Sequence, residues 1–225
     1  MRYFSPEEIK KEKERISLEF SEQKGSPIVV SGKAIAVTLE FLDQEQKILD
    51  CGCGNGVFLK SLHDRGFKHL SGADFDEYRK LDFLRDFKTL DFSFNKMPWE
   101  DSSFDAVTAW QVMEHLENPH NFIREVARIL NPSGLFIFSM PNIQHIFNRI
   151  FFLRKGDMYR WRKNNNHIAL FPKGIFQKSF LKYFDIVSET YGEGDLPYRF
   201  FSRIKFPSNK WFGRDVVYIL SKKAD

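Results

Sequence analysis

Cysteine is scarce in this chain of 225 residues, which contains only Cys51 and Cys53. One residue separates the two, which is too close for an ordinary disulfide, and two thiols are too few for a structural zinc site. The sequence therefore argues against both kinds of cross-link. We expect the two thiols to be reduced and to act as small residues in a tight turn.

Long hydrophobic runs are also lacking. No stretch of about 18 or more uncharged apolar residues, the length that spans a bilayer, occurs in the sequence. The opening residues MRYFSPEEIK do not place an apolar core behind a basic head, as a secretory signal would. We therefore expect no transmembrane segment and a cytoplasmic location.

Positive and negative charges are nearly balanced. The chain has 34 lysines and arginines and 30 acidic residues, for a net charge of +4. Basic residues accumulate only in the C-terminal quarter, at Arg199, Arg203, Lys205, Lys210, Arg214, Lys222 and Lys223. A solvated surface is the ordinary explanation of such a cluster. Contact with an anionic acceptor, RNA or a membrane surface is the alternative.

Apolar material is plentiful enough for one large core. Hydrophobic residues make up 42% of the chain, and 25 of them are phenylalanines. A chain of this length lies near the upper end of a single domain. We expect one domain, with an apolar pocket or partner surface to account for the excess of phenylalanine.

Short apolar runs alternate with amphipathic stretches from residue 47 onward, a pattern typical of βαβ units and a parallel sheet. The sequence predicts strands at about 47–51, 69–74, 87–91, 104–109, 134–139, 184–190 and 215–221. It predicts helices at about 5–24, 32–42, 56–65, 76–83, 119–130 and 172–183. Residues 142–170 interrupt this rhythm and are expected to be an insertion over the active face.

The clearest motif joins the first predicted strand of this alternation to the next helix. An acid ends the strand, and glycines then occupy every second position, so that the backbone can turn sharply and approach a ligand. A dinucleotide fingerprint, GxGxxG, would place its third glycine where this chain has Val57, so a pyrophosphate site is disfavoured. The motif consists of Asp50, Gly52, Cys53, Gly54 and Gly56.

This motif resembles the acid-x-Gly-x-Gly-x-Gly signature of class I S-adenosylmethionine-dependent methyltransferases. The resemblance, to their small-molecule (type 11/23-like) subgroup, covers about residues 45–221 except the insertion at 142–170. The resemblance implies an α/β fold, with a Rossmann-like, seven-stranded, mostly parallel sheet, helices on both faces and an antiparallel last strand. It implies S-adenosylmethionine as the cofactor and S-adenosylhomocysteine as the product. The five motif residues would then hold the methionine part of the cofactor, with Asp50 on its ammonium side.

Two further acids follow in the order that the resemblance requires. Asp74 ends the second strand, where a carboxylate can accept both ribose hydroxyls of an adenosyl group, and Phe75 adjoins it. Asp91 follows the third strand and is expected to bond the adenine amino group, with Phe92 covering the ring. By the same resemblance, Gln111 lies beside the methionine part of the cofactor.

Two histidines are candidate catalytic residues. His115 lies in the segment WQVMEHLENP after the fourth strand, and His167 lies in NHIALF within the insertion. Either imidazole could remove a proton near neutral pH. The structural alternatives are that His115 shapes the turn beside the cofactor and that His167 caps a loop.

The acceptor is expected to be a small molecule, and the resemblance of residues 139–142 and 166–171 to a subgroup associated with cell-envelope sugars adds a glycan-like acceptor. The sulfonium of the cofactor is already activated, so no metal is expected to take part. Residues 1–44 would cover the cofactor site, and residues 142–170 the acceptor site of a methyltransferase domain spanning residues 45–225. The sequence sets no oligomeric state.

Two other functions stay open at this stage. An RNA methyltransferase would use the basic C-terminal quarter, although the Asn/Asp-Pro-Pro-aromatic segment of amino-group methylases of bases is missing after the fourth strand. A module that binds the cofactor without turnover would retain the same acids and glycines. An oxidoreductase is disfavoured by the glycine spacing.

Overall fold

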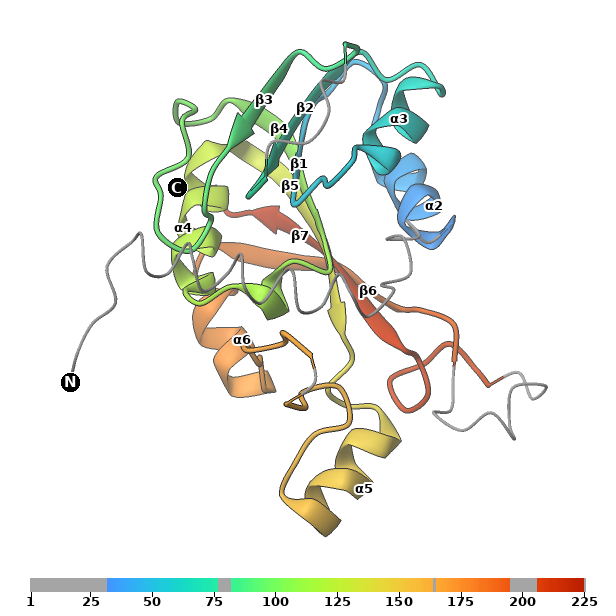
Figure 1. Ribbon diagram of the computed structural model, residues 1–225. Coiled ribbons are helices and arrows are strands. Elements are labelled where there is room, and N and C mark those ends of the chain that lie inside the picture. The colour runs from blue at the N-terminus through green and yellow to red at the C-terminus, as the bar shows by residue number, and fades with distance from the viewer. Residues whose placement is uncertain (1–31, 77–81, 164, 195–205, 225) are drawn as a thin grey trace.

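The structure, a computed structural model, describes residues 32–76, 82–163, 165–194 and 206–224 (Figure 1). The predicted helix at 5–24 and most of the predicted helix at 76–83 lie outside these residues. Three members of the basic C-terminal cluster, Arg199, Arg203 and Lys205, lie outside them as well.

Seven strands of the described chain form one sheet in the order β3-β2-β1-β4-β5-β7-β6. The strands are β1 (Lys47–Cys51), β2 (His69–Asp74), β3 (Asp86–Thr89), β4 (Phe104–Trp110), β5 (Leu130–Pro141), β6 (Phe184–Tyr191) and β7 (Asp215–Lys222). Strands β3, β2, β1, β4 and β5 pair in parallel, whereas β7 runs antiparallel to both β5 and β6. The predicted α/β fold, including its antiparallel last strand, is confirmed.

Helices cover both faces of this sheet. They are α2 (Gly32–Phe41) and α3 (Val57–His63) on one face and α4 (Pro119–Ile129) and α6 (Lys173–Ser179) on the other (Figure 1). Successive strand residues point to opposite faces. Accordingly Ile48 and Ala106 join the buried cluster under α2 and α3, while their neighbours Leu49 and Val107 join the cluster under α4 and α6.

Helix α4 shows how the local sequence sets these boundaries. The Asn118 side chain accepts a hydrogen bond from the Asn121 amide at the helix start, and Pro119 occupies the first turn, where its missing N–H costs nothing. Phe122 and Val126 then fall on the buried side, one turn apart. The Phe122 ring packs edge-on against Phe136 of β5, so the helix is held to the sheet by aromatic contacts.

Two elements differ from the sequence-based expectation. Strand β5 begins at Leu130, directly after α4, whereas the sequence predicted this strand from about residue 134. Helix α5 (Ile146–Lys155) forms inside the predicted insertion and projects beyond the sheet (Figure 1). The His145 side chain caps its start by accepting from the Phe147 amide, and Gly156 ends it in a left-handed conformation.

None of the described helices combines the length and the apolar character needed to cross a bilayer.

The strand order places a topological switch point between β1 and β4. The chain leaves β1 toward β2 and β3 on one side and then returns to form β4 on the other. In open α/β sheets, ligands bind at the carboxyl ends of strands beside such a point, because the two connecting loops diverge there. The glycine motif follows β1, and a short 3-10 helix, η1 (Met113–His115), follows β4, so both lie at this edge.

Candidate active site

The glycine loop after β1 has the backbone conformation that only glycine adopts readily. Gly52, Gly54 and Gly56 have φ angles of 73°, 53° and 74°, all in the left-handed region. The amides of Gly52 and Cys53 both donate to the Ala73 carbonyl at the end of β2, at 2.8 and 3.2 Å. The loop is thereby fixed against two parallel strands before any ligand arrives.

Asp50 is buried beneath this loop, with 2% of its surface exposed. The Thr108 hydroxyl of β4 donates to its Oδ1 at 2.7 Å. Removal from water raises the pKa of Asp50 to about 8, the Thr108 hydrogen bond opposes that rise, and the nearby Asp74 carboxylate adds to it. A nearby cation, such as the ammonium of an amino acid, would favour the ionised form.

The buried Asp50 makes the stability of the fold depend on pH. The folded chain keeps this proton up to about pH 8, while the unfolded chain releases it near the ordinary aspartate value of 3.8. Between these values the folded state binds more protons, so the free energy of unfolding falls as pH rises. Between pH 6 and pH 8 we expect the free energy of unfolding of the protein to fall by about 2 kcal/mol more than that of the Asp50→Asn variant.

Urea unfolding of both proteins at the two pH values measures this difference. Asp43→Asn, at an exposed position, is the control and should follow the unmodified chain. Parallel stability curves for the protein and its Asp50→Asn variant would show that Asp50 is ionised in the fold throughout.

Asp74 ties the second strand to the glycine loop. Its Oδ2 accepts from the Gly54 amide at 2.8 Å, and its Oδ1 accepts from the Phe75 amide at 2.7 Å. Burial raises the pKa of Asp74, and hydrogen bonds from the Gly54, Asp76 and Phe75 amides oppose that rise. The carboxylate therefore lies beside the loop, at the position where the sequence places a ribose ligand, and it is only partly buried.

The two cysteines are free and buried, Cys51 as the last residue of β1 and Cys53 in the glycine loop. Burial raises the pKa of both thiols far above the usual value, so both stay protonated. The Cys53 sulfur lies 3.0 Å from the position that a Cβ on Gly72 would take. Its role is therefore to fill space between the loop and β2.

The two residues predicted to contact the adenine differ in how much of each side chain is exposed. Asp91 is half-buried after β3, and its Oδ1 accepts from the Ser93 amide at 2.9 Å. The ring of Phe92 is only 5% exposed and packs edge-on against Phe122 in the core. Core packing therefore occupies the Phe92 ring, and its contact with an adenine stays a prediction, as does the ligand role of the half-exposed Phe75.

Gln111 follows β4 in a left-handed conformation, with φ 56°. Its backbone amide and its side-chain Nε2 both donate to the Ser139 hydroxyl of β5, at 3.2 and 3.0 Å. This bond between neighbouring strands turns the chain sharply into η1. Val112, the next residue, packs so closely on the glycine loop that a Cβ on Gly52 would lie 2.4 Å from its Cγ2.

The structure brings the two candidate histidines together, with ring centroids 4.9 Å apart. Two main-chain bonds do this: the amides of Ile168 and Ala169 donate to the Glu114 carbonyl of η1 at 2.7 and 3.0 Å. The His115 Nδ1 lies 3.2 Å from the Asn166 carbonyl. The insertion is thus fastened to the carboxyl end of β4.

Burial governs the ionisation of this group. It lowers the pKa of His115 and lowers that of His167 to about 4, with the nearby His115 adding to the shift of His167. It raises the pKa of Glu114 to about 8. Both imidazoles are therefore neutral near pH 7, and each can present a nitrogen lone pair.

Glu114 is a site residue that reasoning from the sequence left without a role. It is 1% exposed, and its Oε1 lies 3.9 Å from the His115 Nε2. The sequence held one signal for its role, a charged residue directly after the apolar pair Val112 and Met113. A glutamate that is fully buried almost always has a polar partner.

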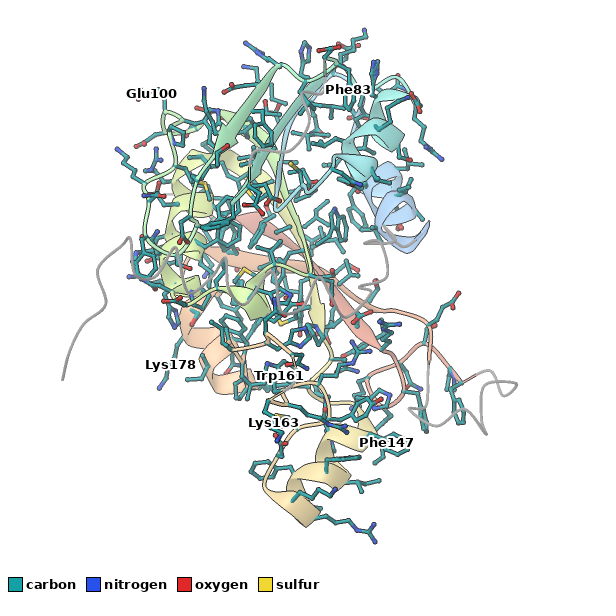
Figure 2. All side chains as sticks on the ribbon, in the orientation of Figure 1. Phe83, Glu100, Phe147, Trp161, Lys163 and Lys178 are labelled. Atoms are coloured by element: carbon teal, nitrogen blue, oxygen red, sulfur yellow. The ribbon has the colours of Figure 1, made fainter. Side chains whose placement is uncertain are left out.

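Flat side chains of the insertion form two clusters, and the one at Trp161 contacts this group. The Trp161 indole N–H donates to the Ala169 carbonyl at 2.9 Å, and its ring lies 5.8 Å from that of His167. The Arg162 guanidinium stacks over the rings of Tyr159 and Phe151, at 4.5 and 4.7 Å. Figure 2 shows Trp161 between the sheet and α5.

Methyltransferases are found both among the curated relatives and among the solved structures that this chain is similar to. The curated relatives include a ubiquinone biosynthesis O-methyltransferase of Neisseria meningitidis, 32% identical over 107 residues, which are 43% of this chain and 44% of the relative. They also include a sterol 24-C-methyltransferase of Gibberella zeae, 32% identical over 99 residues, 40% of this chain and 26% of the relative. The chain thus spans less than half the length of these two relatives.

Solved structures share the fold. An S-adenosylmethionine-dependent methyltransferase from Mesorhizobium loti aligns over 85% of this chain and 98% of its own, with a TM-score of 0.57 and 16% identity. One from Methanosarcina mazei aligns over 84% and 98%, with a TM-score of 0.58 and 19% identity. Residues 2–183 match the family described as a methyltransferase domain. The chain belongs to this family of class I S-adenosylmethionine-dependent methyltransferases.

Proposed function

We propose that this protein transfers the methyl group of S-adenosylmethionine to a hydroxyl oxygen of a small organic acceptor. The observation that carries the proposal is the group formed by Glu114, His115 and His167, which gathers a buried glutamate side chain and two neutral imidazoles at the carboxyl end of β4. A sulfonium is already activated toward attack, so such a group is not needed by the cofactor. A hydroxyl acceptor, in contrast, must lose a proton.

The proposed cofactor position follows from the two loops at the switch point. The methionine part would lie over the glycine loop, above the buried Asp50. The ribose hydroxyls would bond Asp74 at the end of β2, and Asp91 would accept from the adenine amino group. The contact between Val112 and the position of Gly52 joins this loop to η1. The acceptor group would therefore adjoin the methyl-bearing end of the cofactor.

In the reaction, the acceptor hydroxyl releases its proton through the group of Glu114, His115 and His167 to solvent water, and the resulting oxygen attacks the methyl carbon in line with the sulfur. An O–CH3 bond forms as the CH3–S bond breaks, which leaves neutral S-adenosylhomocysteine. The chain would accelerate this step by alignment, by water exclusion under the insertion, and by stabilising the acceptor oxygen as it loses its proton. A carboxylate or thiolate acceptor would not need the last of these.

Two features support a small acceptor. The two curated relatives described above carry names that refer to ubiquinone biosynthesis and to a sterol, which are both small molecules. The flat side chains of Tyr159, Trp161 and Arg162 in the insertion present aromatic and guanidinium surfaces, which suit the face of an aromatic ring. Phenols and catechols are therefore the acceptors to test first.

The test is formation of methylated product from methyl-labelled S-adenosylmethionine with separate pools of catechols and phenols, carboxylic acids, and RNA. We expect turnover with a phenolic acceptor. His167→Asn should then lower kcat by about 100-fold, because hydroxyl activation typically contributes 10²–10⁴-fold. Binding of S-adenosylhomocysteine should change less than about two-fold, since the histidine acts on the acceptor.

His120→Asn is the matched control, because this histidine is exposed on α4, outside the group. Product from RNA alone would favour the nucleic-acid alternative. Cofactor binding without product from any pool would indicate a non-catalytic module.

A further inference from the structure

The side chain of Glu114 is buried, and its two oxygens lack hydrogen-bond partners among the described residues. Only 1% of the residue is exposed. An ionised carboxylate is costly to bury without partners, and burial accordingly raises the pKa of this side chain. The structure therefore has a strong acceptor in its interior that calls for a cation or a donor.

His115 cannot supply that donor in its present arrangement. Its Nδ1 faces the Asn166 carbonyl at 3.2 Å, which requires the proton of a neutral ring to sit on Nδ1. The lone pair of Nε2 then points toward the Glu114 Oε1, 3.9 Å away. Two acceptors thus face each other, at a distance too long for a hydrogen bond even if one of them were protonated.

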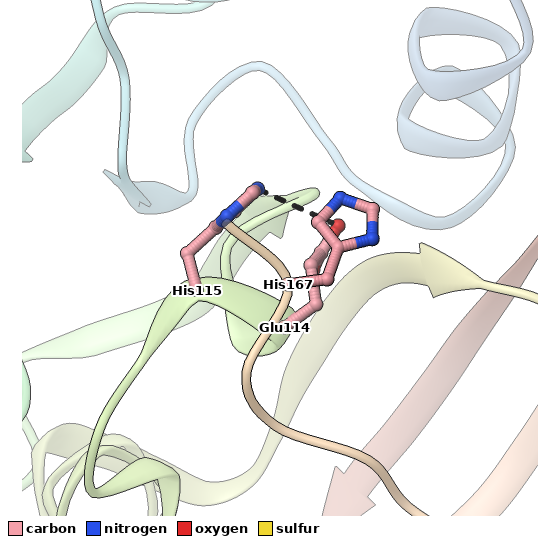
Figure 3. Close-up of side chains that lie close together, drawn as sticks. All are labelled: Glu114, His115 and His167. Carbon is pink, nitrogen blue, oxygen red and sulfur yellow. Dashed lines mark ion pairs between the residues drawn. The ribbon is translucent and has the colours of Figure 1, made fainter. Parts of the chain in front are cut away.

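His167 adds a third acceptor to the same space. Its Nδ1 is buried and has no hydrogen-bond partner among the described residues. The main-chain bonds from Ile168 and Ala169 to the Glu114 carbonyl hold its backbone beside η1. Figure 3 shows the three side chains converging from η1 and from the insertion, with the His115–Glu114 contact as a dashed line.

A single proton cannot resolve this arrangement, whereas a metal ion can. One proton would satisfy one pair and leave the other carboxylate oxygen and the His167 nitrogen unpaired. The three ligand atoms lie within 4.8 Å of one another. Tetrahedral coordination with bonds of about 2.0–2.2 Å places ligand atoms about 3.4 Å apart, so side-chain rotations that draw the atoms together by about an ångström would complete the site.

We propose that Glu114, His115 and His167 bind a Zn²⁺ ion through one carboxylate oxygen and two imidazole nitrogens, with a coordination position left open. Two nitrogen ligands favour zinc over Mg²⁺ or Ca²⁺, which prefer oxygen. Three protein ligands with an open position are typical of catalytic rather than structural zinc. The bond between His115 and the Asn166 carbonyl is the outer contact that orients a metal-binding histidine.

The open position gives the ion a role, which rests on the function proposed above. An acceptor hydroxyl bound there would have its pKa lowered by the ion and would release its proton to solvent water. The ionised oxygen would then attack the methyl carbon as before. This proposal departs from the expectation, drawn from the sequence, that no metal takes part.

The test is titration of the chelator-treated full chain with Co²⁺, followed by its visible absorption, and with Zn²⁺ in competition. We expect one ion per chain and displacement of Co²⁺ by Zn²⁺ but not by Mg²⁺ at equal concentration. Glu114→Gln and His167→Asn should each weaken Zn²⁺ binding by at least ~100-fold, because each removes one of three ligands. His120→Asn should leave the affinity unchanged.

Circular dichroism shows whether each variant is folded. Glu114→Gln keeps the size of the side chain and replaces an ionisable group by a neutral one, so this variant is expected to fold in the absence of metal. A folded Glu114→Gln variant that binds Zn²⁺ as well as the unmodified chain would overturn the proposal, as would an unmodified chain that binds no Co²⁺. Product formation without bound metal would overturn the zinc site alone, and stoichiometric metal binding without O-methylation would overturn the proposed function alone.

Discussion

Replacing Asp74 by alanine is expected to weaken S-adenosylhomocysteine binding by at least ~100-fold. The hydrogen bonds from both ribose hydroxyls would be lost, and each hydrogen bond to a charged group contributes about 1.5–3 kcal/mol. The carboxylate also accepts from the Gly54 and Phe75 amides, so its removal loosens the glycine loop. Isothermal titration with S-adenosylhomocysteine measures the change.

A 2′-deoxyribose analogue of the product separates the two contributions. If Asp74 bonds the ribose, the unmodified chain should bind the analogue more weakly than S-adenosylhomocysteine. The Asp74→Ala variant should bind the two ligands with equal affinity. If Asp74 only holds the loop, the missing hydroxyl will cost the same affinity in both proteins, and the ribose role will be wrong. Asp76→Ala is the control, because its carboxylate is not assigned to the ribose.

Gly52→Ala is expected to reduce the free energy of unfolding by about 2–4 kcal/mol, the sum of a left-handed alanine and an overpacked contact. The φ angle at this position is 73°, and the new Cβ would lie 2.4 Å from the Val112 Cγ2. Relief of that contact has to move either the glycine loop or the segment entering η1. Cofactor binding should therefore fall together with stability, as urea unfolding and titration with S-adenosylhomocysteine would show.

Gly156→Ala provides a matched control for backbone strain alone. Gly156 has a φ of 64° at the end of α5, and nothing lies within 4 Å of the position of its Cβ. The free energy of unfolding of this variant should fall by only about 1–2 kcal/mol. Its affinity for S-adenosylhomocysteine should be unchanged. Equal losses at the two glycines would show that the Val112 contact is unimportant.

The sheet could be predicted from the sequence because its signals are local. The apolar run at 47–51 and the acid and glycines after it form one continuous pattern, and β1 and β2 occupy the predicted residues. Helix α5 escaped prediction because its apolar residues surround the helix instead of forming one stripe. Asn148 is its one fully buried residue, so no hydrophobic face revealed its period.

The candidate site was predictable only in pieces. Asp50 and the glycines are recognisable because they form one short motif, and Asp74 is recognisable because it ends the next strand. The group at Glu114 depends on residues more than 50 positions apart, which main-chain bonds bring together. No spacing in the sequence records such a meeting, and the burial that isolates the Glu114 carboxylate exists only once the insertion has folded over it.

The way the insertion is fastened bears on how such a protein can diversify. Its amides at Ile168 and Ala169 bond the Glu114 carbonyl, and a main-chain bond is indifferent to which side chain its residue carries. Mutation at these two positions can therefore change the surface of the insertion while the anchor to η1 persists. The surface of the insertion can thus change in small steps on this scaffold, while the same bonds keep the backbone of His167 beside η1.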